Sequence, residues 1–544
     1  MHKTKKAIVI LGITGILAQL TIGCSQNQVN YSHEASQIAQ DSEDEEKSIP
    51  LKSRSVDISI NKSERAENRP QPNTEQYDRI YDNTFKLTSQ NPLSTFSIDV
   101  DTASYSNVRR FLSYGQLPPQ DAVRIEELIN YFHYDYPQPQ GDKPFSINTE
   151  ISESPWNKNH QLVRIGLQGK KMATENLPAS NLVFLIDVSG SMNQTNKLPL
   201  LKSSMRLLVS ELSAKDRVAI VVYAGAAGVV LPPTPGNEKR KILEAIDNLG
   251  AGGYTAGSEG IKLAYEVAKN NFIESGNNRV ILATDGDFNV GVSSDAELVR
   301  LIEEKREEDV FITVLGFGIG NLKDAKMEKL ANKGNGNYAY IDNIREARKV
   351  LVKEIGATLF TIAKDVKIQV EFNPAKVKSY RLIGYVNRQL SERDFKDDTK
   401  DAGELGAGHS VTALYEIIPV GVNSDDDRPE SLRYQQKQVK DTAYNSDELM
   451  LVKLRYKQPD ANNSELITQP IMDKKLSLEM ASNDFRFAAA VAAFGMVLRD
   501  SKYKGNANLD LVLNLAQNSQ GADLDGYRAD FIELVKTAKK IKTN

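Results

Sequence analysis

The sequence contains few residues of the two types that most often carry chemistry or cross-link small folds. It has one cysteine, Cys24, and five histidines in 544 residues. A single cysteine excludes an internal disulfide framework, so the fold must depend on buried apolar side chains. With 40% hydrophobic residues, the chain has enough material for more than one core.

Several motifs of known enzyme classes are also missing. The sequence has no G-x-x-x-x-G-K-[ST] loop and no H-E-x-x-H pair. His2 lies in the leader and His33 in a polar segment, which leaves His133, His160 and His409. These scattered histidines lend no specific support to a zinc site or a Ser/His/Asp triad, although both stay open.

A strong charge of either sign is absent as well. The formal net charge is −4, and no basic patch with interleaved aromatic residues occurs. We therefore expect no nucleic-acid partner.

The N-terminus indicates export. Lys3, Lys5 and Lys6 precede an apolar run over residues 7–22, which ends next to Cys24. This run fits a secretory signal better than a membrane-spanning helix. The segment resembles a bacterial lipoprotein signal, which implies a signal peptide over 1–23, cleavage before Cys24 and a lipid on its sulfur. An ordinary signal peptide with an incidental thiol is the alternative.

Residues 24–78 are polar and rich in charge, with few apolar side chains. Such a segment cannot offset the entropy of ordering, so we expect a disordered tether. In the lipoproteins that the signal resembles, Ser25 next to the anchor would favour the outer membrane of a Gram-negative cell. The sequence thus predicts a lipid-anchored protein of the cell envelope.

An apolar strand over residues 183–186 ends in an unusual cluster of oxygen-bearing side chains. Asp187, Ser189 and Ser191 occupy alternate positions in the motif D-x-S-x-S. Alternation in an extended segment sends these three side chains to one side. Carboxylate and hydroxyl oxygens suit Mg²⁺, Mn²⁺ or Ca²⁺ rather than zinc.

Two later segments contribute the same kind of ligand. Thr255 lies in the glycine-rich loop 250–257, and Asp285 follows a second apolar strand in the sequence RVILATDG. In open α/β sheets, ligands bind beyond the carboxyl ends of the strands. These two residues and the D-x-S-x-S motif therefore predict one metal site.

This combination resembles the metal-ion-dependent adhesion site (MIDAS) of the von Willebrand factor type A (vWA) domain. The resemblance implies five metal ligands: Asp187, Ser189, Ser191, Thr255 and Asp285. It also implies that Mg²⁺ is the expected ion, with Mn²⁺ or Ca²⁺ as alternatives. In that family the hydroxyls leave much of the cation's charge uncompensated, and a partner's Asp or Glu carboxylate completes the coordination.

The vWA segment spans about 179–361. Apolar strands at 183–186, 218–223, 280–283 and 311–315 alternate with helical patterns, the last of them over 344–358. This alternation predicts an α/β fold, a doubly wound and mostly parallel sheet with helices on both faces. Residues 338–341 are expected to form its edge strand.

The flanks follow other patterns. An N-terminal α+β region spans 79–178, helical over 96–135, and a C-terminal region of strands and helices spans 362–544. Half-buried strands of both flanks, including 145–170, are expected to form one β-sandwich around the vWA segment. Two separate small domains are the alternative.

Two acidic segments are interpreted as helix caps. Asp99, Asp101 and Ser104 precede a helical run, and Ser294 begins another. Capping is the simpler interpretation than a second metal site.

The complete arrangement resembles the bacterial YfbK-like vWA lipoproteins, on SIDVDTASYSNVRRFL and FAAAVAAFGMVLRDS as well as on the vWA motifs. This family supplies architecture more than activity. We expect a non-enzymatic adhesion module that binds an acidic group on a protein partner. The alternatives are an envelope enzyme with a hydrolytic site in a flank, and a metal-independent scaffold for envelope complexes.

Overall fold

The structure, a computed structural model, describes residues 73–173, 177–224, 226–252, 257–286, 288, 294–423 and 439–543. The described residues belong to one compact unit. Cys24 and nearly all of the expected tether lie outside these residues.

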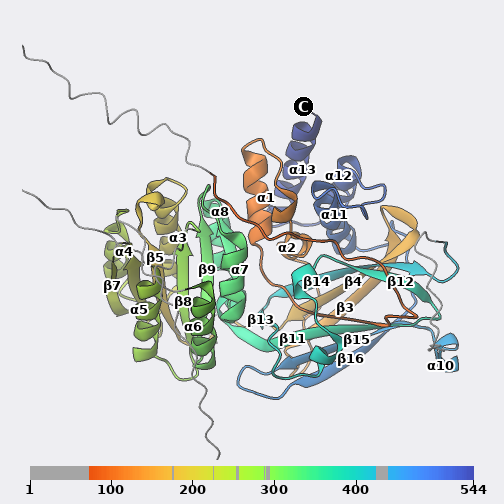
Figure 1. Cartoon of the computed structure of the whole chain (residues 1–544), viewed down its shortest axis with the longest axis horizontal. Coiled ribbons are helices and arrows are strands. Elements are labelled where there is room, and N and C mark those ends of the chain that lie inside the picture. The colour runs from red at the N-terminus through yellow and green to blue at the C-terminus, as the bar shows by residue number, and fades with distance from the viewer. Residues whose placement is uncertain are drawn as a thin grey trace, which may run out of the picture. The chain divides into compact units, whose positions relative to one another are not determined.

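The middle of the chain forms a six-stranded sheet in the order β10-β9-β8-β5-β6-β7 (Figure 1). Neighbouring strands are parallel except β7, which is antiparallel to β6. The bounds are β5 Ser180–Asp187, β6 Arg217–Tyr223, β7 Ala227–Pro235, β8 Asn277–Thr284, β9 Val310–Phe317 and β10 Tyr338–Ile341. Every residue of β5 and β8 is buried, as expected for strands covered on both faces.

Helices cover both faces of this sheet. One apolar cluster joins it to α3 (Leu198–Glu211), α4 (Lys239–Asp247) and α8 (Ile344–Arg348). A second cluster on the other face includes α5 (Gly257–Asn270), α6 (Asp295–Glu307) and α7 (Asp324–Lys333). The predicted doubly wound fold is confirmed, and Ser294 forms the expected capping box at α6.

The expected helix over 344–358 is interrupted. After α8 the chain forms a π-helical turn, Lys349–Lys353, and then α9, Ile355–Leu359. Strand β7 was not predicted, because Pro232, Pro233 and Pro235 are typical of a loop. An edge strand tolerates such prolines, since one side of its backbone needs no partner.

The flanks form two further sheets. One has the order β1-β12-β14-β4-β3, and in the other β13-β11-β15-β16 follow one another while β2 also pairs with β11. The bounds are β1 Lys86–Leu87, β2 Leu93–Ser97, β3 Phe145–Ser154, β4 Asn157–Gly169, β11 Thr361–Phe372, β12 Val377–Ile383, β13 Gly403–Gly406, β14 Ser410–Pro419, β15 Glu448–Lys457 and β16 Glu465–Met472.

Both sheets share one apolar core, which includes Val163, Tyr415 and Val452. Strands from before and after the six-stranded sheet pair directly, β4 with β14 and β2 with β11. The central α/β segment therefore interrupts a sandwich-like region built from both flanks.

The region over 96–135 is less helical than expected. It contains the end of β2, then α1 (Ala103–Ser113) and α2 (Ile125–Asn130). The residues of β2 are strand because they pair with β11, more than 260 residues later, a contact that local periodicity does not reveal. The capping interpretation of Asp99, Asp101 and Ser104 is wrong, because no side chain caps α1.

Helices α11 (Asn483–Leu498), α12 (Leu509–Gln517) and α13 (Tyr527–Thr543) pack with α1 and α2 around one core, and α10 spans Asp441–Tyr444. The alanine-rich α11 is buried along most of its length, which confirms that it is a core element. No helix among the described residues has the length and apolar character needed to cross a membrane.

The described end of the expected tether is held in place. The Thr74 N–H donates to the Gly320 carbonyl over 2.7 Å, and Glu75 pairs with Arg110 over 2.6 Å. Residues 73–78, which composition assigned to the tether, thus include residues that bind the central segment and α1. The ion pair is largely buried, so composition alone underestimates the order of this segment.

Candidate metal site

The six-stranded sheet brings two predicted ligands together at the carboxyl ends of its strands. Strands β5 and β8 are adjacent and parallel, with Ile186 paired to Ala283. Asp187 ends β5 and Asp285 follows β8 immediately, so the two carboxylates emerge from neighbouring strands at the same edge.

Asp187 is fully buried. Its Oδ1 accepts a hydrogen bond from the Ser189 N–H over 2.9 Å, and its Oδ2 accepts one from Thr284 Oγ1 over 3.2 Å. Among the described residues, no basic side chain forms an ion pair with it. Burial raises the pKa of Asp187 to about 6, although the hydrogen bonds from Ser189 oppose this rise. The carboxylate would therefore gain from a cation.

Ser189 and Ser191 lie beside each other in the loop after β5. Their hydroxyl oxygens are 3.0 Å apart. The second serine lies in a short 3-10 turn, Gly190–Asn193, which bends the chain back so that the two hydroxyls meet. Two hydroxyls at this separation can both face one ion.

Asp285 has a basic neighbour that sequence analysis missed. Its Oδ2 lies 2.8 Å from Lys197 Nζ, and both side chains are inaccessible to solvent. Asn321 Nδ2 also approaches this oxygen, at 3.4 Å. A lysine just before a helix is usually exposed, so no signal in the sequence marked this one as part of the site.

Thr255 lies outside the described residues, so its placement stays a prediction. The loop that carries it begins close to the site, because the Gly252 N–H donates to the Val188 carbonyl over 2.7 Å. The structure therefore brings together Asp187, Ser189, Ser191 and Asp285.

The donor set fits a hard divalent cation. The described candidate ligands offer only carboxylate and hydroxyl oxygens, and no nitrogen or sulfur ligand would favour zinc. Asp187, Ser189 and Ser191 would hold the ion, and Asp285 would act directly or through water. An ion there would also offset the cost of burying Asp187.

The three remaining histidines do not form one site. His133 and His409 line a pocket of about 380 Å³, whereas His160 Nδ1 lies 2.6 Å from Glu416 Oε1. Burial lowers the pKa of His409 to about 4. In the described part of the chain, no serine or threonine hydroxyl is hydrogen-bonded to these rings. A triad therefore gains no geometric support from the described histidines.

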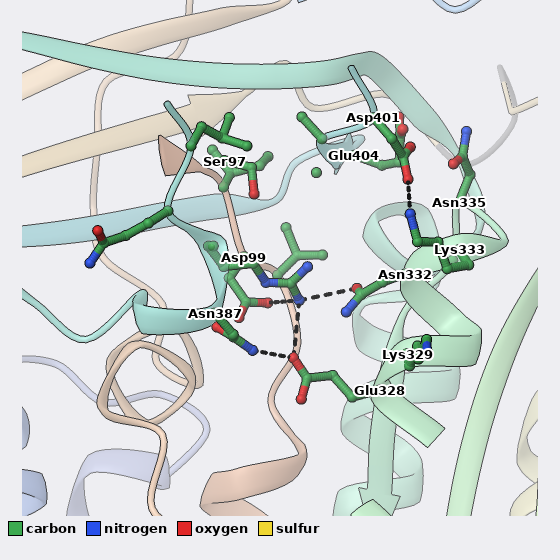
Figure 2. A pocket seen from close by; sticks show the side chains of 18 of the residues that line it. Ser97, Asp99, Glu328, Lys329, Asn332, Lys333, Asn335, Asn387, Asp401 and Glu404 are labelled. Carbon is green, nitrogen blue, oxygen red and sulfur yellow. Dashed lines mark hydrogen bonds and ion pairs between the residues drawn. The ribbon is translucent and has the colours of Figure 1, made fainter. Parts of the chain in front are cut away.

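A second acidic cluster lies where α7 meets the flanks. Carboxylate oxygens of Asp99, Glu127 and Glu328 lie within 4.8 Å of one another. Figure 2 shows Asp99 and Glu328 at a neighbouring pocket of about 400 Å³. Arg388 Nη2 lies 3.0 Å from Asp99 Oδ1, and Arg124 binds Glu127. Because guanidinium groups already pair with these carboxylates, we interpret the cluster as an ion network that joins the central segment to its flanks.

Comparison with known proteins defines the class first. The family model described as von Willebrand factor type A domain matches residues 181–353, the segment that carries the described site. The central segment is therefore a vWA domain. Such domains generally mediate protein–protein interactions, and many bind a divalent metal at this position.

Matches to the flanking regions identify the family within this class. A model described as von Willebrand factor matches residues 71–164, and one described as the C-terminal part of uncharacterized protein YfbK matches 357–541. The chain is 44% identical to uncharacterized protein YfbK of Escherichia coli (strain K12) over 474 residues, which cover 86% of this chain and 81% of that protein. The chain belongs to the YfbK family.

Other similarities are more limited. Uncharacterized protein sll0103 of Synechocystis is 30% identical over 168 residues, 31% of this chain and 39% of that protein. A solved von Willebrand factor type A structure from Catenulispora acidiphila is 19% identical with a TM-score of 0.39, covering 72% of this chain and 90% of that chain.

Proposed function

We propose that this protein is a cell-envelope binding module that uses a divalent cation to bind an acidic group on a protein partner. The cation is held at the vWA site by Asp187, Ser189, Ser191, Thr255 and Asp285, and Mg²⁺ is the expected ion. The function is binding rather than catalysis.

The observation that carries this proposal is the state of Asp187. It is a buried carboxylate with hydrogen-bond donors but no ion pair among the described residues, and it lies next to two facing serine hydroxyls. Burying a charge without compensation is costly, so a site of this kind is suited to an ion. The surrounding oxygen donors match the preferences of Mg²⁺.

The partner's chemistry follows from the charge of the ligands. Serine and threonine hydroxyls are neutral, so they do not cancel the charge of a divalent ion. Mg²⁺ usually keeps several waters, one of which an Asp or Glu carboxylate of the partner would replace. Such a contact would depend on the ion.

Location is the second part of the proposal. Cys24 follows an apolar leader and would carry the lipid, and the acidic segment after it would separate the folded unit from the membrane. In a Gram-negative cell the outer membrane is the expected site. Radiolabelled palmitate should label the wild-type protein and not Cys24→Ala.

Calorimetric titration with Mg²⁺ tests the metal site. The protein comprising residues 71–544, which form one compact unit, should bind one ion per chain. Asp187→Ala should lose measurable binding while its circular dichroism spectrum stays unchanged. Asp510→Ala removes an equal charge from α12, where Asp510 pairs with Lys539 outside the vWA domain, and should bind as the wild type does. If Asp187→Ala binds Mg²⁺ normally, the site is misassigned.

The adhesion step needs a separate experiment. When the immobilised 71–544 protein captures a partner from a native envelope fraction in Mg²⁺, EDTA should release that partner. The immobilised Asp187→Ala variant should not capture it. Capture that persists unchanged in EDTA would favour the metal-independent scaffold instead.

A further inference from the structure

Lys197 is an unusual neighbour for a metal site. Its Nζ lies 2.8 Å from Asp285 Oδ2, and neither side chain is accessible to solvent. A lysine is almost never fully buried without a specific partner, because its ammonium group loses strong hydration. Its position at a proposed metal ligand therefore calls for an explanation.

The surrounding backbone is shaped around this lysine. Gly318 has φ +76°, and a Cβ atom at that position would lie 2.3 Å from Lys197 Cε and 2.4 Å from its Cγ. A side chain at residue 318 would displace the lysine stem. The Lys197 N–H also donates to the Gln194 carbonyl over 3.0 Å, and its carbonyl accepts from Leu201 over 2.8 Å.

The charges at the site show what the lysine changes. Asp187 and Asp285 together carry a charge of −2 when ionised, and Lys197 reduces the net charge of the three side chains to −1. A divalent ion would leave these three side chains and the ion with +1, whereas without Lys197 the total would be zero. The ammonium group repels an incoming cation and occupies an oxygen that the cation could use.

We propose that Lys197 is a positioning residue that competes with the divalent cation for Asp285 and lowers the metal affinity of the site. This inference rests on the proposed function, since it concerns the same ion. In this proposal the Asp285 carboxylate is shared between the ion and the ammonium group of Lys197. The residual positive charge would strengthen the attraction for an acidic group of the partner.

The test is Mg²⁺ calorimetry on the 71–544 protein carrying Lys197→Met. Methionine keeps an unbranched stem over Gly318 and removes the charge. The variant should bind Mg²⁺ about tenfold or more tightly than the wild type, because a repelling unit charge a few ångströms from the ion is lost. Lys202→Met, which removes a partly exposed lysine of α3 that bonds the Asp247 carbonyl instead of the metal site, is the matched control and should leave the affinity unchanged.

Thermal unfolding gives a second readout. In EDTA, Lys197→Met should melt below the wild type, because Asp285 loses the ammonium group. Mg²⁺ should then raise its melting temperature more than it raises that of the wild type. A lysine needed only for packing would not produce this ion-specific rescue.

The outcomes separate the two proposals. Equal or weaker Mg²⁺ binding by a folded Lys197→Met variant overturns the role of Lys197 and leaves the metal site standing. Binding by the variant alone supports the competition and contradicts metal use by the wild type. Absence of binding by both overturns both proposals. If Lys197→Met does not fold, Lys197→Gln replaces it in the same experiment. Glutamine keeps an N–H donor without the charge, and the same outcomes support or overturn the proposal.

Discussion

Two arginines join the vWA domain to its flanks. Arg124 on the segment before α2 contacts Glu127 and Asp324, and Arg388, which follows β12, lies 3.6 Å from Glu328 Oε1 in α7. Their guanidinium groups offset carboxylates that are almost completely buried. The pKa of Arg124 is raised well above its usual value by these carboxylates, against the effect of its burial.

Replacing Arg124 by leucine should destabilise the protein strongly. The change leaves Asp324 and Glu127 without their partner, which typically costs about 3–5 kcal/mol. Arg206→Leu is the control, because its pair with Asp247 is about half exposed and should contribute at most about 1 kcal/mol. Urea unfolding measures both, and equal effects of the two changes would contradict a structural role for the buried network.

Glu126 predicts a pH dependence of stability. Burial raises the pKa of its carboxyl from 4.5 to about 7 in the folded protein, and the nearby Asp99 adds to this rise. The folded state therefore binds a proton that the unfolded state has released, between pH 4.5 and 7. Its contribution to the free energy of unfolding is full below this window and falls as the pH rises through it.

Comparison with Glu126→Gln isolates this effect, since glutamine resembles the protonated acid at every pH. The stability of the wild type relative to this variant should fall by up to about 3 kcal/mol from pH 4.5 to 7 and stay constant above it. Urea unfolding at several pH values provides the measurement. A difference that does not change with pH would show that Glu126 is ionised throughout.

Single residues also show the limits of sequence interpretation. Asp187, Ser189, Ser191 and Asp285 could be predicted because each follows an apolar strand, and parallel strands end at one edge. Lys197 could not, since local sequence does not reveal that its stem lies over Gly318. Asp99 was misread as a cap because its partner, Arg388, lies almost 290 residues later.

At the scale of elements, the turn between α7 and β10 constrains the sheet. A Cβ atom on Gly336 would lie 1.7 Å from the Ile312 carbonyl oxygen in β9. No side chain can be accommodated there without a shift of the backbone. The glycine thus allows the turn to lie directly against the neighbouring strand.

Gly336→Ala should lower the free energy of unfolding by about 3 kcal/mol or more, as a severe case of overpacking. Gly228→Ala in β7 is the matched control, because nothing lies within 4 Å of its added Cβ. The control should change stability by less than about 0.5 kcal/mol. Similar melting temperatures for the two variants would contradict the close approach.

Elements with strong local patterns were the predictable ones. The buried strands β5 and β8 are continuous apolar runs, and the vWA helices have clear periodicity. Strands β2 and β16 were not predicted, because the first is short and the second is a largely exposed edge that contains Pro470. Their strand structure depends on pairing with β11 and β15, which sequence periodicity does not encode.

At the scale of the whole molecule, the sandwich requires both ends of the chain. Strand β14 lies between β12 and β4, and β11 pairs with β2. A fragment over residues 362–544 would lack β2, β3 and β4. It would therefore expose the apolar core that these strands cover.

We expect the 362–544 fragment to be unfolded or aggregated when expressed alone, whereas residues 179–361 have a core on each face of their own sheet and should fold. Amide proton dispersion in NMR spectra distinguishes these states. Addition of the segment 79–178 in trans is a control that could restore pairing of β4 with β14. A well-dispersed spectrum from the 362–544 fragment alone would contradict the shared sandwich.

The most direct measurement of the central claim is anomalous diffraction from a crystal of the 71–544 protein soaked in Mn²⁺. The account predicts one strong peak beside the carboxylate of Asp187 and the hydroxyls of Ser189 and Ser191, with Thr255 completing the ligands. A peak only at another position, or no peak after a soak in saturating Mn²⁺, would contradict the account.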